Sequence, residues 1–134
     1  MAEPAIALSV KQPWAALLAA GIKTIEIRSW PTRRRGRVLI HAGKVADERP
    51  EGWSRIVTPE LAALRGGIIG VGDLMACKGY ASARTFASDA ELHLNDPGWF
   101  APPRLYGFAF RNLKTVKFHP CVGQTLFFRV DGYK

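Results

Sequence analysis

The chain has 134 residues, an apolar fraction of 48% and a formal net charge of +8. This length predicts a single domain over residues 1–134 with one hydrophobic core. No apolar stretch approaches the roughly 20 residues needed to cross a bilayer, and the amino terminus lacks the pattern of a secretory signal peptide. We therefore expect neither a membrane-spanning nor a secreted protein.

The charge is unevenly distributed along the chain. Residues 27–46 carry six positive charges and no acid, whereas residues 47–96 carry five positive and eight negative charges. Residues 97–134 carry six positive charges and one negative charge. Two basic segments that flank an acidic one predict a surface that attracts phosphate groups. The alternative is a generally basic surface that only favours solubility.

The cysteines and histidines do not have the spacing of a metal site. Cys77 and Cys121 are isolated, which is typical of reduced thiols in a cytoplasmic protein. His93 and His119 show no metal-ligand spacing with either cysteine. His41 lies in an apolar stretch, where a hydrogen-bonded core histidine is expected. We predict no metal site and no cofactor.

The first third of the chain predicts a strand, a helix and a second strand. Residues 6–10 are expected to form the first strand. The helix begins at Pro13, because proline is tolerated in the first turn, and ends at Gly21, which suits a left-handed helix terminus. Its Trp14 begins an i, i+3, i+4 apolar stripe and is expected in the core.

The stretch from Gly21 to Gly43 is the most informative part of the sequence. Side chains alternate across a strand, so Ile25 and Ile27 are expected to face a core. The other face then carries polar and aromatic side chains and is expected to line a cleft, with a basic turn and a buried strand at 38–42 after it. The residues of this second face are Thr24, Glu26, Arg28 and Trp30.

The rest of the chain predicts short elements of both kinds. The glycines of one strand, Gly70 and Gly72, are expected to mark close backbone approach or tight curvature. Five to seven strands with two or three helices predict an α+β fold, a small barrel with flanking helices. The expected elements are a loop at 43–57 with a turn at 50–52, a helix from Thr58 to Gly66, a strand at 68–75, a short helix within 82–94 with a capping box at 88–91, an aromatic loop at 99–103, and strands at 105–110, 116–118 and 125–130.

Two strings carry a family resemblance: LSVKQPW at residues 8–14 and GIKTIEIR at residues 21–28. Three further matches are G-x-VLIHA at 36–42, GVGDL at 70–74 and LYGF at 105–108. Together they resemble the ASCH (activating signal cointegrator homology) family, from residue 6 to about 130. The resemblance implies a small PUA-like β-barrel of five to seven strands with two or three flanking helices.

The resemblance also implies a cleft between the first helix and the barrel that binds RNA or a nucleotide. Its wall would carry Lys23, Glu26 and Arg28. Some relatives are described as amidohydrolases of acylated cytidine nucleosides that use a lysine matching Lys23, a threonine two residues further on, and a glutamate. Here the position of that threonine is held by Glu26 or its neighbour Ile25, and the third residue has no assigned match. Other relatives are described as metal-dependent nucleases of single-stranded RNA, which would add a divalent metal.

The candidate residues have structural and functional interpretations. Lys23 is either a cation at the end of the preceding helix or a cleft ammonium that contacts a phosphate or acts as a base. Glu26 could accept a hydrogen bond from a base and Arg28 could bind phosphate, or the two could simply pair with each other. The expected RNA- or nucleotide-binding residues are Lys11, Gln12, Trp14, Lys23, Glu26, Arg28, Trp30, Arg33, Arg34, Arg35 and Tyr106, with Lys23 and Glu26 as the catalytic pair of an enzyme.

The first functional hypothesis is therefore a module that takes single-stranded RNA or a nucleotide into a basic cleft, with splayed bases stacked on aromatic side chains. The second is a small hydrolase acting on RNA or on a modified nucleoside. The third is a protein-interaction adaptor, whose exposed apolar patch would comprise Trp53, Trp99 and Phe100. The sequence carries no signal of oligomeric state.

Overall fold

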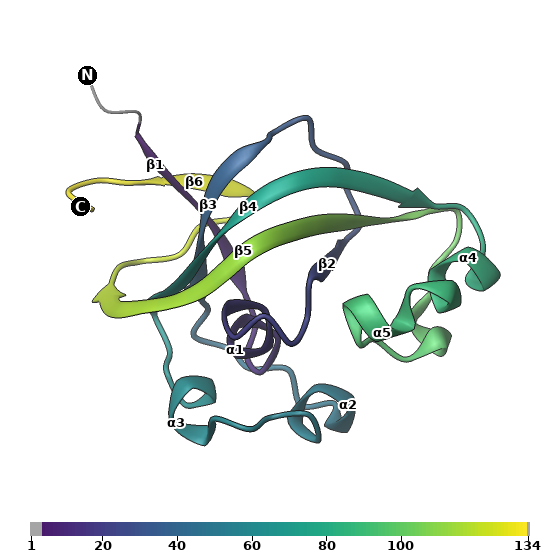
Figure 1. Ribbon diagram of the computed structural model, residues 1–134, viewed down its shortest axis with the longest axis horizontal. Coiled ribbons are helices and arrows are strands. Elements are labelled where there is room, and N and C mark those ends of the chain that lie inside the picture. The colour runs from purple at the N-terminus through teal and green to yellow at the C-terminus, as the bar shows by residue number, and fades with distance from the viewer. Residues whose placement is uncertain (1–3, 134) are drawn as a thin grey trace.

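The computed structural model describes residues 4–133, which form six strands, five short α-helices and one 3-10 turn (Figure 1). In chain order the elements are β1 (Ala5–Val10), α1 (Trp14–Ala19), β2 (Ile25–Arg28), β3 (Gly36–Ala42), α2 (Pro50–Trp53), α3 (Pro59–Ala62), β4 (Gly67–Tyr80), α4 (Ala83–Ser88), α5 (Ala90–His93), the 3-10 turn (Pro97–Trp99), β5 (Leu105–Pro120) and β6 (Phe127–Val130). None of these helices is long and apolar enough to cross a membrane.

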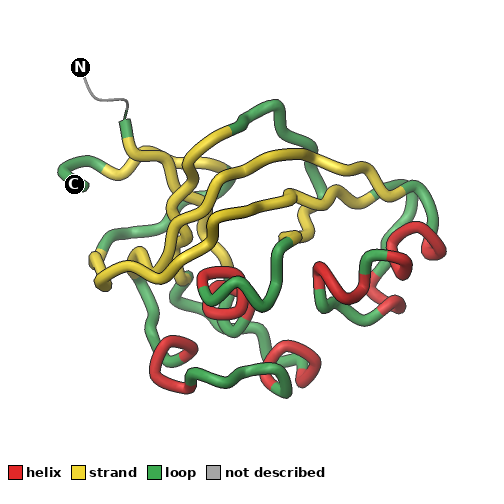
Figure 2. Tube along the Cα trace, viewed as in Figure 1, coloured by secondary structure: helices red, strands yellow, loops and turns green. Residues whose placement is uncertain are grey.

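The six strands form one curled sheet in the order β2-β5-β4-β3-β1-β6. Only β1 and β3 are parallel, and every other neighbouring pair is antiparallel. The long β4–β5 pair makes the back of a half-barrel (Figure 2). The predicted α+β class is confirmed, and six strands fall within the expected range. The sheet stays open between β2 and β6, which are its two edges.

The chain between β3 and β5 contains more helices than expected. The predicted turn at 50–52 is helix α2, which begins at Pro50. The predicted capping box at 88–91 is wrong. Ser82 has an extended backbone and its hydroxyl accepts a hydrogen bond from the Thr85 N–H, so it caps α4. Ser88 instead ends that helix, and its hydroxyl donates to the Thr85 carbonyl at 2.6 Å. The segment therefore divides into α4 and α5.

The strand boundaries also differ from the sequence pattern in the last third of the chain. The two short strands expected at 105–110 and 116–118 are one continuous strand, β5. The intervening residues are mostly polar and exposed, yet they remain in the sheet because β4 pairs with them along its length. A bulge near Asn112, which has a positive φ of 55°, lets the ladder continue.

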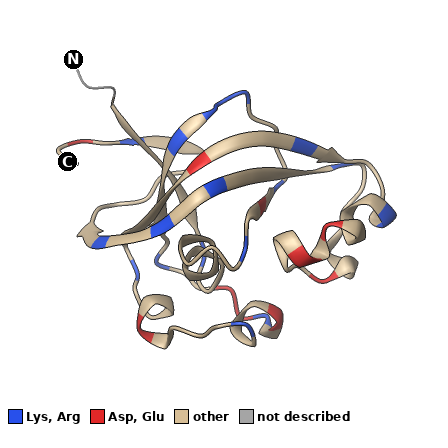
Figure 3. Cartoon of the chain, in the orientation of Figure 1, with Lys and Arg blue, Asp and Glu red and all other residues tan. Residues whose placement is uncertain are grey.

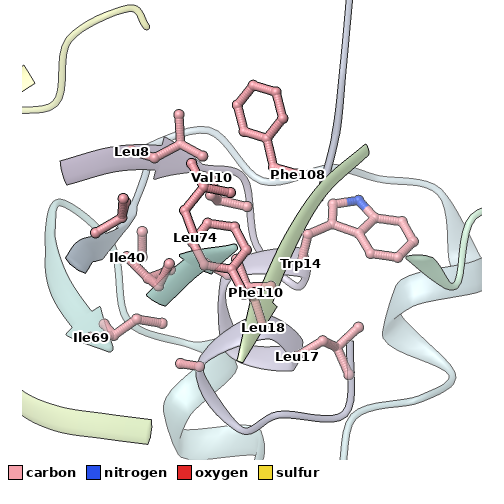
Figure 4. Packing of buried hydrophobic residues seen from close by; sticks show 14 of the residues in the cluster. Leu8, Val10, Trp14, Leu17, Leu18, Ile40, Ile69, Leu74, Phe108 and Phe110 are labelled. Carbon is pink, nitrogen blue, oxygen red and sulfur yellow. The ribbon is translucent and has the colours of Figure 1, made fainter. Parts of the chain in front are cut away.

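The main core lies between the concave face of the sheet and α1, whose six residues are all buried. Figure 4 shows Trp14, Leu17 and Leu18 of this helix among side chains of the surrounding strands. Trp14 is 5% exposed, so its predicted place in the core is confirmed. The helix can approach the sheet closely because Gly70 faces it: a Cβ there would lie 2.5 Å from Ala19 Cβ.

Gly70→Ala should destabilise the fold, because the added methyl group overlaps Ala19 and lies 3.0 Å from the Lys114 carbonyl oxygen. We expect the free energy of unfolding to fall by about 1–3 kcal/mol, as is usual for overpacking. Urea denaturation measures this change. The control is Gly79→Ala on the same strand, where a Cβ meets no atom closer than 3.6 Å; it should shift stability by no more than about 0.5 kcal/mol. Equal effects of the two substitutions would contradict the close approach of α1.

Candidate functional site

The open side of the curled sheet forms a pocket of about 600 Å³. Arg28 on β2 spans the opening, because its Nη2 donates to the Ser9 carbonyl oxygen on β1 at 2.8 Å. Trp30 contacts Phe127 of β6 edge to face, with ring centroids 5.5 Å apart. The residues that line the pocket are Ser9, Lys11, Trp14, Glu26, Ile27, Arg28, Ser29, Trp30, Asp47, Arg49, Trp99, Gln124, Thr125 and Leu126.

The β2 wall has the predicted alternation only in part. Ile25 is buried and Glu26, Arg28 and Trp30 line the pocket, but Ile27, expected in the core, also lines it. The two charged residues also pair with each other: Arg28 Nη2 lies 2.9 Å from Glu26 Oε2. These two side chains thus line the pocket and form an ion pair at the same time.

Lys23 lies behind this wall and does not line the pocket. Its side chain is 1% exposed, and its Nζ donates to the His93 carbonyl oxygen at 2.5 Å and to Asn95 Oδ1 at 3.2 Å. The same nitrogen lies 3.6 Å from Glu26 Oε1 and 4.8 Å from the centre of the Trp14 ring. Burial lowers the pKa of Lys23 from its usual 10.5 to about 8, although the neighbouring Glu26 carboxylate opposes the change.

The opposite wall is built on Asp47, from the loop after β3. Asp47 Oδ2 accepts hydrogen bonds from Trp14 Nε1 at 2.9 Å and from Arg49 Nη2 at 2.8 Å. The Arg49 hydrogen bonds, with help from Trp14, hold the pKa of Asp47 well below its usual range despite partial burial. The Arg49 guanidinium in turn stacks 3.4 Å from the centre of the Trp99 ring. This wall is therefore preorganised and carries both charge and aromatic surface.

Asp47 and Arg49 are site residues that the sequence analysis did not assign, and it named Trp99 only as part of a possible protein-contact patch. The first two lie in a stretch without helical or strand periodicity, so no pattern marks them. Trp99 lies in the predicted aromatic loop. That loop was the one sequence feature that could have indicated a binding role for it. Trp53 and Phe100, the other members of the suggested apolar patch, support neighbouring structure: Trp53 Nε1 donates to the Asp47 carbonyl oxygen, and Phe100 packs against a buried aromatic cluster.

Several predicted binding residues lie outside the pocket. Gln12, just before α1, is fully buried. Its amide donates to the Leu61 and Leu64 carbonyl oxygens at 2.9 and 3.1 Å, and these bonds connect the start of α1 to the end of α3. Tyr106 packs against the main core. The three arginines of the basic turn are exposed outside the pocket, although the Arg34 guanidinium lies 5.3 Å from the centre of the Phe127 ring at its edge. Those arginines are Arg33, Arg34 and Arg35.

The predicted core role of His41 is confirmed. Its Nε2 is 2.8 Å from the Cys121 carbonyl oxygen, and its Nδ1 is 3.0 Å from Ser9 Oγ. The carbonyl requires a donated N–H, so Nδ1 accepts from the Ser9 hydroxyl. Burial lowers the pKa of His41 and keeps the ring neutral near pH 7. Among residues 4–133, no group of three His, Cys, Asp or Glu side chains could hold a metal ion.

Two buried N–H groups of the pocket residues have no acceptor within the described part of the chain. They are Arg28 Nε and Trp99 Nε1. A buried donor without a partner costs about 1–3 kcal/mol. The pocket itself combines three tryptophans, cations and carboxylate acceptors, a set suited to a flat polar ligand with an anionic group.

The curled sheet, its short helices and the aromatic, charged cleft together make an α+β half-barrel domain. The family model of the ASCH domain matches residues 8–117, so the chain belongs to the ASCH domain family. The resemblance stated from the sequence strings is therefore confirmed. The ASCH domain is generally an RNA-binding PUA-like fold.

Comparisons with individual proteins agree with this family. The chain is 63% identical over 35 residues to human activating signal cointegrator 1, and 60% identical over 35 residues to the mouse protein. Each match covers 26% of this chain but only 6% of the relative's length. Crystal structures of ASCH from Zymomonas mobilis and of a point mutant of that protein superpose with TM-scores of 0.65 and 0.66 at 16% and 14% identity. They cover 96% and 97% of this chain, and 89% and 92% of theirs, and so share its fold.

The buried Lys23 ammonium should make stability depend on alkaline pH. Its pKa is about 8 when folded against 10.5 when free, so the unfolded chain binds more protons between these values and stability rises with pH there. Relative to Lys23→Met, the wild-type free energy of unfolding should increase by up to about 3 kcal/mol between pH 8 and 10.5. Urea denaturation across this range measures the difference. Parallel pH curves for the two proteins would contradict the lowered pKa.

Proposed function

We propose that the cleft binds one nucleotide of single-stranded RNA. The observation that carries this proposal is the composition of the pocket: Trp14, Trp30 and Trp99 line it together with cations. Its volume of about 600 Å³ lies within the range of roughly 300–1,000 Å³ that is typical of small-molecule sites. The family membership agrees with this assignment.

The chemistry of each wall suits one part of a nucleotide. Aromatic faces bind nucleobases by stacking, which contributes about 1–3 kcal/mol per base and does not require a particular sequence. The Glu26 carboxylate, on the β2 wall, is an acceptor for an exocyclic amine. Lys11 and Arg49 at the pocket supply positive charge for a phosphate.

A single strand is the form of RNA that such a pocket can accept. A base must leave the helical stack before it can enter a cleft and stack on protein side chains. Double-stranded RNA is instead read across a wide, shallow groove by shape and by backbone contacts. The cleft is a hollow between a sheet edge and a helix terminus, so it suits a splayed base.

Substitutions at the pocket should weaken binding of a random RNA trinucleotide. Trp99→Leu removes an aromatic face from the pocket, so we expect the Kd to rise about tenfold or more. Trp99→Phe keeps an aromatic ring and should lose less. Lys11→Ala removes an exposed cation and should raise the Kd and reduce its salt dependence. Fluorescence anisotropy at several salt concentrations measures each effect.

The control for the charge change is Arg84→Ala, which removes an exposed cation from α4, outside the pocket. It should leave trinucleotide affinity unchanged. Thermal unfolding checks that every variant is folded. The proposal fails if the wild-type chain does not bind the trinucleotide, or if Trp99→Leu and Lys11→Ala bind it as the wild type does.

A hydrolase is the second candidate, and one observation favours it. The Lys23 ammonium, with a pKa of about 8, lies 3.6 Å from the Glu26 carboxylate, which lines the cleft. Because the lysine itself is behind the wall, Glu26 would be the group that takes a proton from water or from a substrate hydroxyl. Lys23 would then hold that carboxylate in position through their ion pair.

The hydrolase candidate predicts turnover of an acylated cytidine or of single-stranded RNA. Product release is followed by chromatography, with and without a divalent metal, since metal is expected only for a nuclease. Glu26→Gln should abolish turnover while thermal unfolding shows a folded protein. Turnover that persists in Glu26→Gln, or no turnover by the wild type on either substrate class, would exclude this candidate.

A further inference from the structure

The convex face of the sheet lies opposite α1 and carries its own apolar cluster. Helices α1, α2 and α3 lie on the same side of the β4–β5 pair (Figure 1). On the other face, buried apolar side chains from four strands gather around Leu39 and Val71. The remaining buried members of this cluster are Ala7, Ile68, Phe128 and Val130.

A hollow of about 920 Å³ lies on this convex face and is lined by basic side chains. Arg37, Lys114, Lys117 and His119 line it, and no carboxylate of the described residues does. Its aromatic floor includes Tyr133, whose ring lies 5.8 Å from the Arg37 guanidinium and 5.2 Å from the His119 ring. The cleft contains two carboxylates, so the two hollows differ in chemistry.

The cations of this hollow are not neutralised within the described residues. No ion pair joins Arg37, Lys114 or Lys117 to a carboxylate in residues 4–133. Asp73 faces Arg37 across the β3–β4 ladder and accepts a hydrogen bond from Asn112 at 2.9 Å, so one carboxylate lies near the hollow but forms no ion pair with its cations and does not line it. Unpaired cations around a shallow hollow attract phosphate groups.

The basic hollow adjoins a second basic hollow at the turn before β3. Arg37 also lines an adjoining hollow of about 780 Å³, together with Arg34 and Arg35. Arg34 stacks on Phe127, and Phe127 contacts Trp30 in the cleft. Figure 3 shows Lys and Arg positions on this loop and repeatedly along β5.

We propose that these five cations, Arg34, Arg35, Arg37, Lys114 and Lys117, form an outer basic tract that binds the phosphate backbone of a longer RNA strand. This inference rests on the proposed function, because the tract extends the strand whose nucleotide occupies the cleft. Phosphate contacts position a strand without reading its sequence. The tract therefore determines how long a strand the domain holds, whereas the cleft contacts the base.

The test compares a trinucleotide with a single strand of about twelve nucleotides. The tract variant combines Arg37→Ala, Lys114→Ala and Lys117→Ala, and leaves the cleft intact. We expect its affinity for the long strand to fall about tenfold or more at low salt. The slope of log K against log salt should flatten by about 2, because each phosphate contact in a single strand contributes about 0.7. Trinucleotide affinity should be unchanged.

The matched control combines Arg55→Ala, Arg84→Ala and Arg104→Ala, which removes the same charge from exposed positions outside the tract. Equal weakening by the two variants, or an unchanged long-strand affinity and slope in the tract variant, would overturn the tract. A failure of the cleft proposal is seen separately, as a wild-type trinucleotide affinity that is absent or insensitive to Trp99→Leu. Thermal unfolding confirms that both triple variants are folded.

Discussion

The geometry of the cleft depends on one buried chain of polar contacts that begins at Lys23. Its ammonium is held by the His93 carbonyl and by Glu26, Glu26 pairs with Arg28, and Arg28 donates to the Ser9 carbonyl. A buried charge is tolerated only when it is paired and hydrogen-bonded. The chain of contacts therefore requires α5, β2 and β1 to keep their positions together. Because β2 and β1 are separated by three strands in the sheet, the Arg28–Ser9 contact determines the width of the opening.

Asp47 plays the corresponding role on the opposite wall. Its carboxylate orients the Trp14 indole and the Arg49 guanidinium, and Arg49 stacks on Trp99. One acceptor thus arranges two aromatic rings and a cation without leaving its own charge unpaired. The cleft consequently presents both hydrogen-bond donors and acceptors, and both cations and carboxylates. The hollow on the convex face presents cations and aromatic rings. This chemistry suits phosphate groups, which are the same whatever the base sequence.

The sequence pattern predicted the elements of the cleft better than those of its surroundings. Alternation placed Ile25 in the core and Glu26 and Arg28 in the cleft correctly, because a strand with one buried face allows one register. Helix caps were harder to predict, since Ser82 and Ser88 each precede a possible helical turn and could each act as its N-terminal cap. Only the backbone conformation of the assembled chain selects Ser82. The polar residues in the middle of β5 likewise predict a loop between two strands. Pairing with β4 nevertheless keeps this segment extended as part of one strand.

The sequence by itself determined the family, the α+β class, the face of β2 that lines the cleft, and the uneven distribution of basic residues. These features are local, because they depend on residue type and on spacing along a few consecutive positions. Tertiary structure alone decided that Lys23 and Gln12 are buried and that Asp47, Arg49 and Trp99 complete the site. Burial and contact between distant segments arise when the whole sheet curls around α1. The type and local sequence of a polar residue do not predict which distant residues it will contact in the folded chain.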